Sequence, residues 1–145
     1  MKITLHRIRD LISGFLHFRR MEEKNILLDY TKFDPKKTVI VDVDGTILEA
    51  KNRDYENASE IAPVIGKLNY MHDHGWTIVY FTARGQLSKN GDMDRIEKEN
   101  RPVLEKWLHD HGVKYDYLLF HKPYGAWYID DKALNIQDFL KKNFR

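Results

Sequence analysis

The chain has 145 residues, no cysteine and a formal net charge of +2. This length favours one domain, the lack of cysteine excludes disulfides and thiolate metal sites, and the near-neutral charge gives no general attraction to nucleic acid or anionic membranes. No apolar run approaches the roughly 20 residues of a membrane span. Arg7, Arg9 and Asp10 interrupt the apolar core that a secretion signal needs, so we expect a cytoplasmic protein.

Residues 1–34 are expected to form an N-terminal amphipathic extension, and residues 35–145 the main domain. In residues 1–20, apolar side chains recur at spacings of three and four, which is typical of an amphipathic helix. They are Leu5, Ile8, Leu11, Ile12, Phe15 and Leu16. Such a helix packs on its own domain or joins a homo-oligomer more often than it binds a membrane surface. Residues 25–33 are expected to form a short edge strand or an extended arm.

The first strong strand is the apolar run Val39–Val41, which Asp42, Asp44, Gly45 and Thr46 follow closely. A continuous apolar run is typical of a strand that is buried in a parallel sheet. Ligands of open α/β sheets bind just beyond the carboxyl ends of the strands. Two acids at that point indicate a metal ion, a phosphate group or both, and Gly45 allows a tight turn.

A polar loop or small hairpin is expected over residues 48–56, standing above this strand end. The next element is a helix from about residue 58 to residue 74, which Asn57 or Ser59 can cap. A second strand is expected over residues 77–81.

The polar loop of residues 84–91 leaves the sheet at the end of this second strand, so we expect it to line a pocket. A helical region follows over residues 93–111. Pro102 either kinks one helix there or opens a second one, with Asn100 as its cap.

Two further strands are expected over residues 115–120 and 126–129, followed by a last helix over residues 133–143. Strands and helices alternate along the main domain. This order predicts an α/β fold, a three-layer α/β/α sandwich around a mostly parallel, Rossmann-like sheet.

The tetrapeptide His-Asp-His-Gly occurs twice, at residues 72–75 and 109–112, each time before a predicted strand. One interpretation is a histidine-rich metal site. The other is that both helices end in the same way, with histidine at the negative helix terminus and glycine closing the last turn. We favour the second interpretation, because both copies lie at the edge of the sheet opposite the polar strand ends.

Polar side chains stand at the ends of all four predicted strands. They are Asp42 and Asp44, then Thr82, then Lys122, then Asp130 and Asp131. Over roughly residues 37–140, this order resembles the haloacid dehalogenase (HAD) superfamily of Mg-dependent phosphohydrolases. The resemblance implies a HAD-like core. The predicted elements fill the segments between the motifs, so no cap domain is expected and the site should be open.

The resemblance also assigns catalytic roles. Asp42 matches the nucleophile, which forms an aspartyl-phosphate, and Asp44 matches the general acid-base. Thr82 matches the hydroxyl that binds a phosphoryl oxygen. Lys122 matches the lysine that holds the nucleophile and the phosphate together despite their like charges.

A magnesium ion is implied by the same resemblance, with Asp42, the backbone carbonyl of Asp44, Asp130 and Asp131 as its ligands. Oxygen ligands suit Mg²⁺ better than zinc. Which member of the acidic pair binds the metal directly stays open. The expected phosphate-binding positions are Gly45, Thr46, Ala83, Arg84 and Lys122, in part because the backbone amides of a tight turn can meet an anion.

Three segments resemble small HAD phosphatases associated with bacterial capsule and surface-polysaccharide synthesis: Ala83–Pro102, Lys122–Tyr124 and Tyr128–Ala133. That likeness implies a phosphorylated sugar or polyol as the substrate, and no stable nucleic-acid partner.

Two alternatives remain. One is a phosphatase of nucleic-acid ends, in which Arg84, Lys89, Arg95 and the basic N-terminus follow the backbone. The other is a non-catalytic binding protein that keeps the fold.

Overall fold

The computed structural model describes residues 27–145, of which residues 31–145 form one compact unit. The amphipathic helix expected in residues 1–20, and with it the contact proposed for a homo-oligomer, lies outside the described residues. Residues 27–33, the described part of the expected arm, contain no strand.

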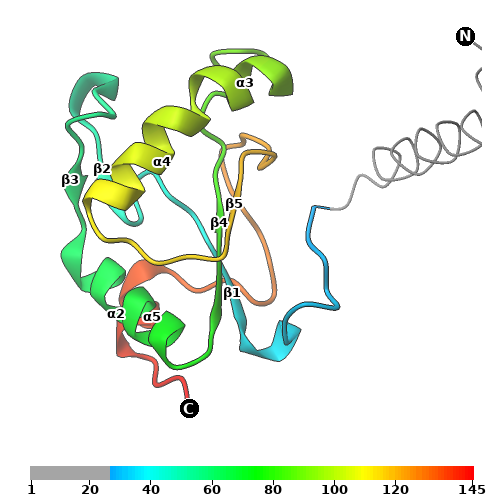
Figure 1. Cartoon of the computed structure of the whole chain (residues 1–145), viewed down its shortest axis with the longest axis vertical. Helices are drawn as coiled ribbons and strands as arrows, with labels where there is room; N and C mark the ends of the chain where they lie inside the picture. The colour runs from blue at the N-terminus through cyan, green and yellow to red at the C-terminus, as the bar shows by residue number, and fades with distance from the viewer. Residues whose placement is uncertain (1–26) are drawn as a thin grey trace, which may run out of the picture. The chain divides into compact units, whose positions relative to one another are not determined.

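A parallel sheet with the strand order β1-β4-β5 forms the centre of this unit (Figure 1). Its strands are β1 (Thr38–Val41), β4 (Thr77–Phe81) and β5 (Tyr117–Leu119). These three confirm the first three predicted strands. Because the strands are parallel, their carboxyl ends lie at one edge, where the polar residues follow them.

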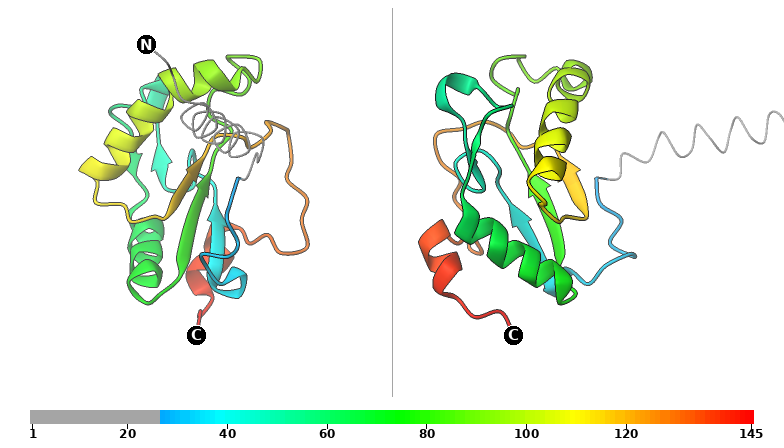
Figure 2. Two further views of the ribbon diagram at one scale, coloured as in Figure 1. Left: turned by 45° about the vertical axis from the view of Figure 1, so that its right-hand side comes forward. Right: turned by 60° about the vertical axis from the view of Figure 1, so that its left-hand side comes forward.

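The helices connect successive strands of this sheet. They are α2 (Ala62–Asp73) between β1 and β4, and α3 (Met93–Glu99) and α4 (Arg101–Asp110) between β4 and β5. Right-handed crossovers that progress in one direction place such helices on one face of a sheet, and Figure 2 shows α2 and α4 on the same side.

The buried core lies under these helices. Ile78 and Tyr80 belong to it, and both are fully buried. On the other face of the sheet, Ile40 is 56% exposed. The mixed α/β class is therefore confirmed. The described residues do not confirm the third layer of the predicted sandwich.

Helix α2 begins later than expected, because the residues before it form a small antiparallel sheet. Its strands are β2 (Leu48–Glu49) and β3 (Ser59–Glu60). We call residues 48–60 the hairpin. The residue before α2 is Ile61, and no side chain caps the helix. The predicted cap at Asn57 or Ser59 is therefore wrong.

The second helical region is divided into α3 and α4 at Asn100. Pro102 lies in the first turn of α4, where a missing N–H costs no helical hydrogen bond. Of the two alternatives left open for Pro102, the structure shows the second, in which Pro102 opens a new helix. Asn100 stands at the N-cap position, but its side chain makes no cap bond.

The strand predicted over residues 126–129 is wrong for this structure. Residues 121–135 contain no strand, and Trp127 and Ile129 are 86% and 97% exposed. A short apolar run becomes a strand only where a neighbouring strand pairs with it, and here the open edge of β1 does not pair with residues 126–129. The last helix, α5 (Ile136–Lys141), is shorter than expected and packs on α2.

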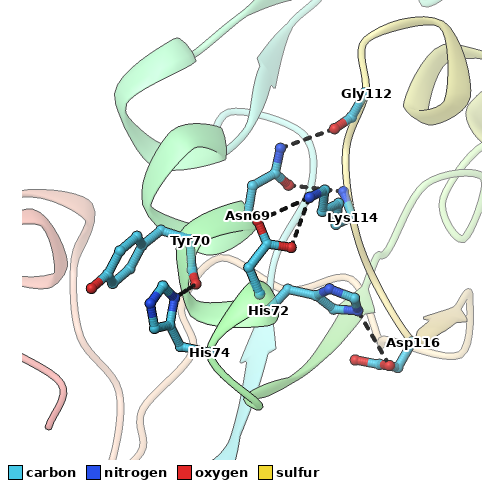
Figure 3. A network of polar contacts seen from close by, with 8 residues as sticks. Asn69, Tyr70, His72, His74, Gly112, Lys114 and Asp116 are labelled. Carbon is cyan, nitrogen blue, oxygen red and sulfur yellow. Dashed lines mark hydrogen bonds and ion pairs between the residues drawn. The ribbon is translucent and has the colours of Figure 1, made fainter.

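A polar network holds α2 to the segment that leads into β5 (Figure 3). The Asn69 side chain donates to Gly112 O (2.9 Å) and accepts from Lys114 N (2.8 Å). Asp116 accepts from Ile78 N at 2.8 Å and also faces His72 at 3.4 Å. These contacts join three chain segments at the amino ends of β4 and β5, away from the polar strand ends.

The two His-Asp-His-Gly segments end their helices in the same way, as the favoured interpretation predicts. His74 Nδ1 lies 2.7 Å from Tyr70 O and its ring stacks on the Tyr70 ring. His111 repeats both contacts with Trp107, at 2.8 Å from the carbonyl oxygen. Each helix is followed by a glycine with positive φ. Among the described residues, no group of three histidine or acidic side chains could hold a metal ion.

Candidate active site

The turn after β1 is closed by its own backbone. Gly45 has a φ of +83°, which favours glycine, and its N–H donates to Leu48 O at 2.8 Å. The Thr46 N–H donates to Val43 O at 3.1 Å. Both amides expected to meet a phosphate are therefore donors inside the loop.

Asp42 receives two hydrogen bonds from residues expected at the site. Lys122 Nζ donates to its Oδ1 at 2.8 Å, and Thr46 Oγ1 donates to its Oδ2 at 2.9 Å. The lysine side chain is 13% exposed and that of Asp42 is 34% exposed. The ammonium group also lies 4.2 Å from the centre of the Tyr128 ring. Asp42 is thus fixed in direction while part of it still faces solvent.

Asp44 is held by a buried arginine. Arg84 Nη2 donates to Oδ1 at 2.6 Å and Arg84 Nε donates to Oδ2 at 3.1 Å. The arginine side chain is only 1% exposed. A bidentate guanidinium–carboxylate pair fixes both distance and orientation. Arg84 was expected to bind phosphate, but here its fork orients the carboxylate expected to act as the acid-base.

The guanidinium group of Arg84 also contacts the hairpin, through Tyr55. Its Cζ lies 4.2 Å from the centre of the Tyr55 ring, a cation–π contact. Its Nη1 is buried and has no hydrogen-bond partner among the described residues. Tyr55 was missed by the sequence analysis, although a single aromatic residue in a charged loop was a signal.

Thr82 is 1% exposed and lies at the end of β4. Its N–H donates to Leu119 O at 2.9 Å, and its hydroxyl oxygen accepts from Arg84 N at 3.0 Å. The hydroxyl proton has no acceptor among the described residues, so it can be donated to a phosphoryl oxygen.

The loop after Thr82 is fastened to the end of β5. Gln86 Nε2 donates to Phe120 O at 2.7 Å, and Gln86 N donates to Ala83 O at 3.0 Å. Gly85 has a φ of +83°, and a Cβ there would lie 2.6 Å from Asn100 Oδ1. Gln86 was also missed, because an isolated glutamine in a polar loop gives no signal.

The predicted magnesium ligands are not gathered in this structure. Asp130 and Asp131 lie in the exposed segment after Ile129, and Asp130 Oδ1 accepts from Lys132 N at 2.8 Å. That backbone bond lowers the pKa of Asp130 from its ordinary value. No three carboxylate or histidine groups among residues 27–145 lie close enough to share a metal ion. The site does not fit a magnesium ion as it stands.

The geometry therefore brings three of the four strand ends together. Lys122 meets Asp42, and Arg84 joins Asp44 to Thr82. A carboxylate held by an ammonium group, a second carboxylate beside it and a buried hydroxyl are groups that can handle a phosphoryl group.

Known proteins provide one informative comparison. A crystal structure of a structural-genomics target from Vibrio cholerae is 36% identical in sequence, with a TM-score of 0.71. The match covers 74% of this chain and 89% of that chain. No family model and no curated protein matches.

Two further likenesses are to chains of the Pnkp1/Rnl/Hen1 complex. One is described as an RNA repair complex. They are 22% and 16% identical, with TM-scores of 0.46 and 0.45, and the matches cover 82% and 97% of this chain. The matches span 39% and 44% of those chains. At such scores neither likeness identifies a shared fold.

Proposed function

This chain belongs to the same protein family as the Vibrio cholerae protein, and from the site at its strand ends we propose that it is a HAD-type phosphatase. The contact between Lys122 and Asp42 carries the proposal. Eighty residues separate the two in sequence, and the fold brings an ammonium group onto the carboxylate that the motif assigns as nucleophile. Such a pair suits an attack on a phosphate dianion, because the cation offsets the repulsion between two anions.

The reaction proceeds in two steps on the chain's own residues. An Asp42 oxygen forms a bond to phosphorus while the bond from phosphorus to the ester oxygen breaks, and Asp44 gives that oxygen a proton. A water oxygen then forms a bond to phosphorus while the bond from phosphorus to the Asp42 oxygen breaks, and the water gives one proton to Asp44. Inorganic phosphate leaves and Asp42 is restored. Lys122 and the Thr82 hydroxyl bind the phosphoryl oxygens during both steps.

Arg84 fixes the orientation of Asp44 in its carboxylate form, the form that takes the proton from water in the second step. The guanidinium group bonds both carboxylate oxygens of Asp44. Because the Arg84 side chain is buried, the surrounding residues keep it from turning away from Asp44. An acid-base must lie within hydrogen-bond reach of the proton that it moves, so a fixed carboxylate is an advantage.

We also propose that the reaction uses a magnesium ion, although its expected ligands lie apart in the described residues. Asp42, the backbone carbonyl of Asp44, Asp130 and Asp131 are its proposed ligands, and the ion would offset negative charge on the phosphoryl group. Binding requires Asp130 and Asp131 to approach Asp42. The segment of residues 121–135, which holds them, has no strand or helix to oppose that movement.

The proposed substrate is a phosphorylated sugar or polyol of carbohydrate or capsular polysaccharide synthesis. Only the hairpin, α2 and β4 lie between Asp44 and Thr82, so no inserted domain covers the site there. An open site accepts a substrate that projects beyond the phosphate group.

The nucleic-acid alternative loses support from three ion pairs. Arg84 is buried against Asp44, and Lys89 and Arg95 both pair with Glu99, at 3.5 and 3.4 Å. Three of the cations that would follow a nucleic-acid backbone therefore already have partners, and the fourth element, the basic N-terminus, lies outside the described residues. The non-catalytic alternative does not explain why Lys122 and Asp42 meet at a partly exposed strand end.

Hydrolysis of p-nitrophenyl phosphate with added Mg²⁺ tests the proposal. The wild-type chain should release p-nitrophenol, and Asp42→Asn should abolish release while Asp94→Asn, a matched exposed aspartate on α3, should not. Full activity in folded Asp42→Asn would contradict the mechanism.

A further inference from the structure

A cavity opens beside Asp44 under the hairpin. Its volume is about 350 Å³, and its walls include Asp44, Glu49, Lys51, Arg53, Tyr55 and Ser59. That volume is in the range of small-molecule sites. The cavity lies on the side of Asp44, the residue that would protonate the departing oxygen, so it is placed to receive the leaving group rather than the phosphate.

The walls of the cavity carry more unpaired positive charge than unpaired negative charge. Lys51 and Arg53 form no ion pair or side-chain hydrogen bond within residues 27–145, and both line the cavity. Arg84 already balances the charge of Asp44. Two cations therefore face a single uncompensated acid, Glu49. A cavity of this kind favours an anionic occupant.

The backbone that carries the two cations is held in an uncommon conformation. Asn52 and Arg53 both have positive φ, at 52° and 60°. A bulky residue such as arginine rarely adopts the left-handed region, and such conformations gather at functional sites. Lys51, Asn52 and Arg53 form the short helix η2 (Lys51–Arg53), which borders the cavity.

Contacts outside this helix keep the hairpin in place. Trp107 Nε1 donates to Ala58 O at 3.0 Å, and the Tyr55 ring lies against Arg84. Asn57 Nδ2 bonds both carboxylate oxygens of Asp54, at 3.1 and 2.9 Å. These contacts fasten the chain after the two cations, and the pairing of Glu49 with Ser59 fastens the chain before them. The backbone that carries Lys51 and Arg53 is therefore held at the cavity, while their side chains stay exposed to an incoming ligand.

We propose that Lys51 and Arg53 select phosphate monoesters whose leaving group carries a second anionic group, a carboxylate or another phosphate. The inference rests on the proposed function and adds the substrate class. The second anion lies between the two cations, and Ser59 and Glu49 offer hydrogen bonds to hydroxyl groups on the same molecule.

The test compares kcat/KM for matched phosphate esters. Sorbitol 6-phosphate has a neutral far end, 6-phosphogluconate replaces that end with a carboxylate, and fructose 1,6-bisphosphate carries a second phosphate. p-Nitrophenyl phosphate serves as the reference without either group. The variants are Lys51→Gln, Arg53→Gln and the double variant, with Lys98→Gln on the exposed face of α3 as a matched control.

The wild-type chain should hydrolyse one or both doubly anionic esters with a kcat/KM about tenfold above that of sorbitol 6-phosphate, because charge-assisted hydrogen bonds are the strong ones. The double variant should lose that preference and keep its rate on p-nitrophenyl phosphate, and Lys98→Gln should behave as wild type. The ester preferred tells whether the anion is a carboxylate or a phosphate.

Equal rates on all three sugar and polyol esters, or a preference that survives in the double variant, would overturn the inference and leave the phosphatase proposal standing. If no ester is hydrolysed at all, p-nitrophenyl phosphate included, both proposals fall together.

Discussion

Lys122 Nζ lies 2.8 Å from Asp42 Oδ1, although the two residues belong to strand ends separated by 80 positions in the sequence. β4 lies between their strands in the sheet, so the contact crosses the width of the sheet edge. A contact over that span depends on the whole fold. The contact therefore forms only when the order of the strands is correct and the site is assembled.

Lys122→Ala should lower kcat/KM on p-nitrophenyl phosphate by about two to three orders of magnitude, in the range seen when one preorganised charge-stabilising donor is removed. The loss of stability should be small, because Asp42 is one-third exposed and water can solvate it. Steady-state kinetics with thermal unfolding measures both. Lys98→Ala is the matched control, and equal activity of the two variants would remove Lys122 from the mechanism.

Arg84→Lys tests the fork on Asp44. A lysine cannot bond both carboxylate oxygens in one plane and loses the contact with Tyr55, so kcat should fall by at least about tenfold. Replacing a buried arginine should also cost about 1–3 kcal/mol of unfolding free energy. Arg95→Lys, at an exposed pair with Glu99, should change neither. A folded Arg84→Lys variant with wild-type kcat would exclude the positioning role.

Strand positions were predictable because each strand is a continuous apolar run that stops at polar residues. Val39–Val41 and Thr77–Phe81 are such runs, and in the fold the two pair with each other. That Lys122 and Asp42 lie at one edge of the sheet followed from parallel strands, and their meeting was implied by the HAD resemblance. The fork between Arg84 and Asp44 was not predictable, because nothing in a local pattern says which carboxylate a loop arginine will meet.

The error at residues 126–129 has a physical cause as well. A short apolar run is assigned as a strand on composition, but a strand exists only when a neighbour pairs with it. Likewise, the late start of α2 reflects the pairing of Glu49 with Ser59, a contact between segments that local helix preference does not describe.

Metal binding gives a spectroscopic prediction. If Mg²⁺ draws Asp130 and Asp131 toward Asp42, the adjoining Trp127, now 86% exposed, should move into a less aqueous environment. Addition of Mg²⁺ should shift tryptophan emission to shorter wavelength, and chelation should reverse the shift and abolish hydrolysis. Trp127→Phe should lose the shift and keep the metal-dependent activity. Hydrolysis that survives chelation would contradict the proposed metal site.

A pair of glycine substitutions tests the loop after Thr82. Gly85→Ala should destabilise the fold by about 1–3 kcal/mol, because φ is positive and the new Cβ would lie 2.6 Å from Asn100 Oδ1. Gly66→Ala is the control, since it lies inside α2 with no atom within 4 Å of a Cβ. It should stabilise by about 0.5–1 kcal/mol. Chemical denaturation measures both, and equal effects of one sign would refute the steric account.

The ion pair between Glu97 and Arg101 gives a pH prediction. The hydrogen bond from Arg101 lowers the pKa of Glu97 below its ordinary value of 4.5. A lowered carboxylate pKa in the fold adds stability above the unfolded pKa, and this stability is lost as the pH falls through the folded pKa. The unfolding free energies of wild type and Glu97→Gln should therefore differ at pH 7 and converge below pH 4.5. A difference that does not change with pH would exclude this linkage.

The central claim is that Asp42 carries the phosphoryl group between two steps, and a trapped intermediate tests it most directly. Asp44→Asn, which slows the release of phosphate, is mixed with p-nitrophenyl phosphate and Mg²⁺, quenched in acid and analysed by peptide mass spectrometry. The account predicts the added mass of one phosphoryl group on the peptide that contains Asp42, and none in the double variant with Asp42→Asn. Turnover without any modified peptide, together with full activity of Asp42→Asn, would contradict it.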